Sequence, residues 1–75
     1  MKLSDCDINT KCEIVAVDVK DMKMKIRLCE IGFFVGGRVE VLRKSALKKT
    51  ILISVLDCAF AIKLDVAKDI EVRYA

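Results

Sequence analysis

The chain has 75 residues, of which 55% are hydrophobic and 33% charged, and its formal net charge is +3. This length suits a single domain over residues 1–75 with little room for a deep substrate cleft. The hydrophobic content argues against disorder, and nonspecific nucleic-acid binders usually carry a larger or more clustered positive charge. No apolar run reaches the ~18–20 residues that span a bilayer, and the polar start of the chain is unlike a secretory signal. We therefore expect a cytoplasmic protein.

The first part of the chain predicts a turn, a strand and a helix. Leu3–Asp7 suits a short helical turn because its polar residues can cap it, and the β-branched residues of Lys11–Val19 favour a strand. Asp21–Ile31 predicts a helix, with Asp21 as its N-cap and Gly32 just past its end.

Two apolar stripes run along this predicted helix at i, i+4, i+7 spacing. The first consists of Met24, Leu28 and Ile31, and the second of Met22, Ile26 and Cys29. The second stripe has two interpretations. It either packs on the N-terminal turn around Leu3 and Cys6, or it stays exposed and offers Met22 and Ile26 for self-association.

Apolar and polar residues alternate after the glycine pair Gly36–Gly37, which predicts four further strands. A helical turn over Asp65–Lys68, with Asp65 as its cap, precedes the last strand. Five short strands of this size must curl into a small, strongly bent barrel, with the helix inserted between strands 1 and 2. The residues expected to point inward are Val39, Val41, Ile51, Ile53, Val55, Cys58, Phe60, Ile62, Leu64, Ile70, Val72 and Tyr74.

Nothing in the cysteine pattern predicts a metal site. The chain has no histidine, and its four cysteines lack the paired spacing of zinc sites. Each stands where a buried apolar residue would also fit, so we expect reduced, buried thiols, with a thiolate site for iron or zinc as the alternative. A disulfide would require an oxidising compartment. The cysteines are Cys6, Cys12, Cys29 and Cys58.

Catalysis is not expected either. The three glycines match neither of the phosphate-binding loop patterns, so no cofactor-binding or catalytic residue is assigned. Four acidic residues do not follow EF-hand spacing, and a solvated acidic rim is the simpler interpretation. These four are Asp57, Asp65, Asp69 and Glu71. We expect a protein that is not an enzyme and holds no metal or cofactor.

The segment Arg27–Gly36, with the sequence R-L-C-E-I-G-F-F-V-G, resembles the signature of the FeoA family. In that family a helix ends R-L-x-E-[LI]-G and a second glycine follows shortly after. Asn9 and Asp57 stand where family members usually have glycine, and both residue types adopt the turn conformations that glycine allows. Further matches, which extend the resemblance from Leu3 to Val72, are Val39–Val41, Ala46–Leu47, Ile51–Val55 and Ala61–Ile62 before Ala67.

The resemblance implies a mainly β fold with one α-helix, an SH3-like barrel of about five strands, in a bacterial cytoplasm. It also implies an accessory protein of ferrous iron uptake. Family members are associated with FeoB, a membrane transporter with a cytoplasmic G-domain, which they bind and modulate or help to assemble. The family carries a general association with transition metal ions. Membrane contact would then come only through the partner.

A small-barrel module that binds nucleic acid is the alternative. Such sites stack bases on exposed aromatic rings. Phe60 and Tyr74 are expected to point inward, so only Phe33 and Phe34 remain for stacking. We therefore expect no nucleic acid as the partner.

One hairpin offers a candidate docking surface. Inward residues face one another if Val41 pairs with Ile53, and this register places Leu42 opposite Leu52 on the outer face. Leu47 lies in the loop between the two strands, where turns favour Gly, Asn, Asp or Pro.

An apolar ledge with a basic rim has the usual build of a protein interface. The ledge consists of Leu42, Leu47 and Leu52, and its rim includes Lys48 and Lys49 together with Arg43 and Lys44. The alternative is that the helix or the N-terminal turn covers the leucines and the loop folds back on the barrel.

Overall fold

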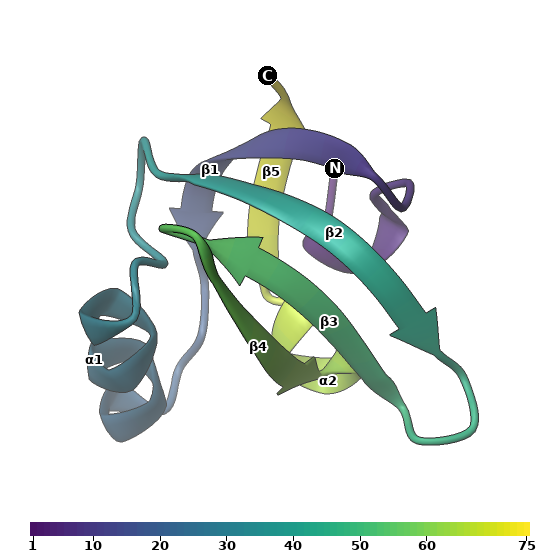
Figure 1. Cartoon of the computed structure of the whole chain (residues 1–75). Coiled ribbons are helices and arrows are strands. Elements are labelled where there is room, and N and C mark those ends of the chain that lie inside the picture. Colours follow the sequence, from purple (N-terminus) through teal and green to yellow (C-terminus); the bar gives the residue numbers. More distant parts are fainter.

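One antiparallel sheet of five strands dominates the computed structural model, which describes all 75 residues (Figure 1). Neither α-helix is long and apolar enough to cross a membrane. The elements in chain order are the 3₁₀ turn η1 (Leu3–Asp5), β1 (Thr10–Val17), α1 (Met22–Glu30), β2 (Arg38–Ser45), β3 (Thr50–Val55), β4 (Cys58–Lys63), α2 (Leu64–Ala67) and β5 (Ile70–Tyr74).

The strands lie side by side in the order β4-β3-β2-β1-β5. Short hairpins join β2 to β3 and β3 to β4, whereas β1 pairs with β2 across the long connection that contains α1. β5 returns to the other side of β1. The pairing shifts between Ile14 and Ala16 and again between Val41 and Arg43. Such irregularities bend a strand and increase its twist. The sheet accordingly curls around its own core (Figure 1), as an SH3-like barrel does.

The core follows the predicted alternation. In β3 the side chains of Ile51, Ile53 and Val55 are buried, while Leu52 and Ser54 between them are half-buried. The predicted inward residues of β2, β3 and β5 are buried, except the one at the end of β5. In β4 the predicted inward residues after the first, Phe60 and Ile62, are half-buried. A strand buries alternate residues because successive side chains point to opposite faces. The mainly β barrel with one inserted helix is therefore confirmed.

Two residues predicted to point inward are exposed instead. Tyr74 is the last residue of β5 and is 49% exposed, and its hydroxyl donates a hydrogen bond to Asp7 Oδ2 over 3.2 Å. Cys58 is the first residue of β4, directly after a turn, and is exposed. Both stand at strand ends, where the alternation continues past the edge of the core.

Helix α1 begins and ends as predicted, to within one residue at each end. The Asp21 carboxylate accepts the amide of Lys23 over 3.0 Å and so caps the free N–H groups of the first turn. Leu28 is 2% exposed, and Met24 and Ile31 pack partly buried beside the core. The first apolar stripe of the helix therefore faces the barrel.

The turns confirm one prediction and correct another. Asn9 and Asp57 have φ angles of 60° and 62°, the left-handed conformation that glycine usually supplies. The turn predicted over Asp65–Lys68 is a helix one residue earlier, with Lys63 in the N-cap position and no side-chain cap. Asp65 lies in its first turn, where its negative charge favours the helix without capping it.

Candidate functional site

The hairpin between β2 and β3 carries the predicted docking residues, which we call the hairpin surface (Leu42, Leu47, Lys48, Lys49 and Leu52). Leu47 at its tip is 94% exposed, so the loop does not fold back on the barrel. Lys48 and Lys49 beside it are exposed as well. The Lys48 amide donates to Ser45 Oγ over 3.2 Å, which holds the turn that presents the leucine.

The register of this hairpin differs from the prediction at one point. Val41 pairs with Ile53 as expected, but Arg43, not Leu42, lies opposite Leu52. The shift follows a bulge after Val41, which adds a residue to β2 that has no partner on β3. Leu42 and Leu52 are half-buried and do not form the opposed outer pair that was predicted.

One basic residue of the predicted rim is engaged within the molecule. Lys44 Nζ donates to the backbone oxygen of Ser4 over 3.0 Å and ties the hairpin to η1. Arg43, Lys48 and Lys49 make no such hydrogen bond or ion pair and remain exposed. The hairpin surface is thus an exposed leucine with basic neighbours.

The second stripe of α1 faces away from the N-terminal turn. Met22 is 65% exposed and Ile26 is 54% exposed. Leu3 and Cys6, which were one predicted packing partner of this stripe, are buried in the core instead. The interpretation in which these residues pack together is therefore wrong. The stripe lines one side of an apolar hollow of about 380 Å³. We call it the helix hollow, and its lining is Val17, Met22, Lys25, Ile26, Cys29, Phe33, Phe34 and Val35.

Sequence reasoning missed the contribution of Phe34 and Val35 to this hollow. They are 45% and 66% exposed, next to the buried Phe33. The signal was the uncharged run from Ile31 to Gly37, which holds more apolar residues than one loop can bury. Burial of Phe33 removes one of the two rings considered for base stacking, whereas Tyr74, which was excluded as inward-pointing, is exposed.

The cysteines separate into two kinds. Cys6 and Cys12 are fully buried, as predicted, and their Sγ atoms lie in direct contact in the core. Their Cα atoms lie 7.8 Å apart, farther than a disulfide usually spans. Cys29 and Cys58 are exposed, which contradicts the expectation that all four are buried.

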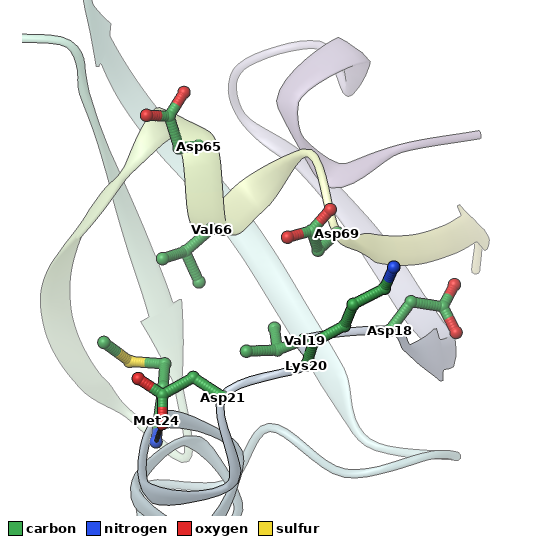
Figure 2. Close-up of a pocket in the computed structure, with 8 residues that line it drawn as sticks. All are labelled: Asp18, Val19, Lys20, Asp21, Met24, Asp65, Val66 and Asp69. Carbon is green, nitrogen blue, oxygen red and sulfur yellow. Dashed lines mark hydrogen bonds between the residues drawn. The ribbon is translucent and has the colours of Figure 1, made fainter.

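The predicted acidic rim is divided by the fold. Asp57 lies in the β3–β4 turn. Glu71 lies on β5, where its Oε1 atom is 3.7 Å from the N-terminal nitrogen of Met1. Only Asp65 and Asp69 share a hollow, of about 470 Å³, and Figure 2 shows Asp65 pointing away from the other carboxylates. No three cysteine or acidic side chains come close enough together to hold a metal ion. The hollow is lined by Asp18, Val19, Lys20, Asp21, Met24, Asp65, Val66 and Asp69.

Comparison with known proteins gives one family and one fold. A family model described as the FeoA domain matches residues 1–74. The fold is similar to that of FeoA from Chlorobium tepidum, with a TM-score of 0.90 and 24% identity over 99% of this chain and 70% of that one. No curated protein sequence matches.

Two further solved structures are similar along nearly their whole length. A protein described as an iron uptake regulatory protein (FeoA) has 25% identity and a TM-score of 0.84, with 100% of this chain and 96% of that one covered. A zinc-complexed FeoA from Stenotrophomonas maltophilia, described as an SH3 domain protein, has 26% identity and a TM-score of 0.82 over 97% and 89% of the two chains.

Proposed function

Because the chain belongs to the FeoA family over residues 1–74, we propose that it is a cytoplasmic accessory protein of ferrous iron uptake. It binds the cytoplasmic G-domain of a FeoB-type membrane transporter and modulates or helps to assemble that transporter. Its similarity to the Stenotrophomonas protein, described as a candidate activating factor of ferrous iron transport, supports this role. In this proposal the chain works by binding and not by catalysis.

The exposure of Leu47 is the observation that carries the proposal. A leucine that is 94% exposed at a hairpin tip contributes nothing to the core. Its neighbours Lys48 and Lys49 are exposed cations, so the surface fits an apolar pocket with an acidic border. We therefore place the contact with the transporter at the hairpin surface.

The proposal predicts that the chain co-purifies with the transporter. An affinity-tagged FeoB-type transporter from the same bacterium is expressed with this chain, solubilised in detergent and purified, and the chain is detected by mass spectrometry. We expect it to be retained by the intact transporter and lost when the G-domain is deleted. Retention that is equal with and without the G-domain, or no retention at all, contradicts the proposal.

The helix hollow is proposed as a self-association surface, because it exposes Met22, Ile26, Phe34 and Val35 together. Adjacent exposed apolar side chains of this kind favour contact with another protein surface. If two copies bury this face, the double variant Met22→Lys, Ile26→Lys is expected to convert a dimer to a monomer of 8.4 kDa without unfolding it. Analytical ultracentrifugation at several concentrations measures the mass.

Glu30→Lys is the matched control for the double variant. It also adds positive charge to an exposed position of α1, but Glu30 does not line the hollow. We expect this variant to keep the dimer. If the wild-type chain is monomeric at high concentration, the self-association proposal is wrong. This result would not affect the transporter proposal.

A further inference from the structure

The two edge strands of the sheet differ in how they are protected. The edge of β5 is covered by the N-terminus, since Val72 N donates to Met1 O over 2.7 Å and Lys2 forms a bridge with Glu71. β4 forms the opposite edge and pairs only with β3. It has six residues in regular register, with no bulge and no proline, and its one charge, Lys63, stands at its end. Natural proteins usually protect edge strands against pairing with other chains, and β4 lacks such protection.

The turn before β4 determines which of its backbone groups are free. Leu56 and Asp57 have φ angles of 50° and 62°, as in a two-residue type I′ hairpin turn. In such a hairpin the flanking pair Val55–Cys58 exchanges backbone hydrogen bonds, and bonded and non-bonded pairs then alternate along the ladder. The N–H and C=O groups of Ala59 and Ala61 therefore point away from β3. Neither residue takes part in any backbone hydrogen bond outside the ladder.

A groove lies beside this free edge, between β4 and α1. Its volume is about 220 Å³, and apolar side chains make up most of its lining. Figure 1 shows α1 beside the β3–β4 hairpin. The exposed cations Arg27 and Lys63 stand at the two sides of the groove. The apolar lining consists of Met24, Leu28, Ile31, Phe60, Ala61, Ile62 and Val66.

We propose that this groove binds an extended acidic segment of a partner protein, which adds to β4 as a sixth strand. A free strand edge beside a helix provides both parts of such recognition: main-chain groups supply hydrogen bonds, and the groove receives alternate side chains. Apolar side chains of the segment enter between α1 and β4. Carboxylates of the segment face Arg27 and Lys63. The inference goes beyond transporter docking and does not depend on it.

A second copy of the chain fits the groove less well. Two β4 edges could pair with each other, but β4 has the sequence C-A-F-A-I-K and no acidic residue. An antiparallel pair with Ala59 opposite Ala61 would give each Lys63 only Asp57 of the facing copy as a counter-charge, and β4 would offer none to Arg27. The charge of the groove therefore favours an acidic segment over self-pairing.

The test uses two peptides of opposite charge, one alternating valine with glutamate and one alternating valine with lysine. Each is titrated to millimolar concentration into the isotope-labelled chain, and amide signals are followed by NMR. We expect the glutamate peptide to shift the signals of Ala59 and Ala61 saturably and to slow their hydrogen exchange. The proposal is overturned if the two peptides act equally, if neither shifts these amides, or if the shifts fall on the helix hollow or the hairpin surface.

Ala61→Pro removes one free edge donor and leaves the β3 ladder intact, because proline is tolerated on edge strands. We expect it to weaken binding of the glutamate peptide at least tenfold, and more than Ala61→Val does, which alters the same groove residue but keeps the amide. Should the proline variant fail to fold, the pair Arg27→Glu, Lys63→Glu changes only exposed residues. This pair is expected to reverse the preference toward the lysine peptide. Unchanged peptide preference in that pair excludes recognition of an acidic segment, and wild-type binding by a folded Ala61→Pro excludes strand addition; either result overturns the proposal.

Discussion

Replacing Gly32 with alanine is expected to lower the free energy of unfolding by about 2–5 kcal/mol, the sum of a backbone cost and a packing cost. Gly32 ends α1 with a φ of +109°, a conformation that L-residues rarely adopt. A Cβ atom there would also lie 2.8 Å from Val55 Cγ2 and 3.0 Å from Leu56 Cδ1. The methyl group would therefore press on the β3–β4 hairpin, and Val55 belongs to the core.

The loss is large for a chain of this size. At about 0.05–0.15 kcal/mol per residue, 75 residues support a total stability of roughly 4–11 kcal/mol. Thermal and urea unfolding followed by circular dichroism would measure the change. In Gly32→Ala we also expect the end of α1 and the loop to Phe34, which line the helix hollow, to become more mobile.

Gly36→Ala is the matched control for Gly32→Ala. Gly36 has a φ of +90°, but no atom lies within 4 Å of the position that its Cβ would take. It should show the backbone cost alone, about 1–2 kcal/mol. Equal losses in the two variants would mean that the contact with Val55 has no part in the stability of this turn.

Local sequence patterns were sufficient to predict the elements of the fold. Asp21 and Gly32 mark the two ends of α1 because one offers a side-chain acceptor for free amides and the other allows a positive φ. The alternation in β3 predicts its buried face because the period of a strand is two. Each of these signals depends on residues that are close together in the chain.

Surface features were harder to predict because they depend on where distant segments lie. The bulge after Val41 shifts the partner of Leu52 by one residue, and no residue in the hairpin marks this shift. The open groove depends on the distance that α1 keeps from β4, which tertiary packing determines. The exposed position of Leu47 at the hairpin tip agrees with the sequence pattern because a leucine in a turn is itself a local signal.

Leu47→Asp is expected to weaken binding to the transporter's G-domain by at least about 30-fold, the effect of losing a contact worth ~2 kcal/mol. The substitution removes the apolar centre of the hairpin surface and places a negative charge where the proposal expects an acidic border on the partner. Stability should stay within about 0.5 kcal/mol of the wild type, because the side chain is 94% exposed. Thermal unfolding checks that part of the prediction.

Ala46→Asp separates the loss of the leucine from the added charge. Ala46 is exposed in the same turn, so this variant introduces the same carboxylate and keeps Leu47. We expect it to weaken binding less than Leu47→Asp does. If both variants lose the same affinity, charge alone governs the contact and the leucine is not its centre.

The central claim, that this chain docks on the transporter through the hairpin surface, is tested most directly by one titration. The fluorescently labelled G-domain of a FeoB-type transporter from the same bacterium is titrated with the wild-type chain and with Leu47→Asp, and anisotropy is recorded. We predict saturable binding by the wild type and binding at least about 30-fold weaker by the variant. Equal binding by the two proteins would exclude the hairpin surface, and no binding by the wild-type chain would contradict the transporter proposal itself.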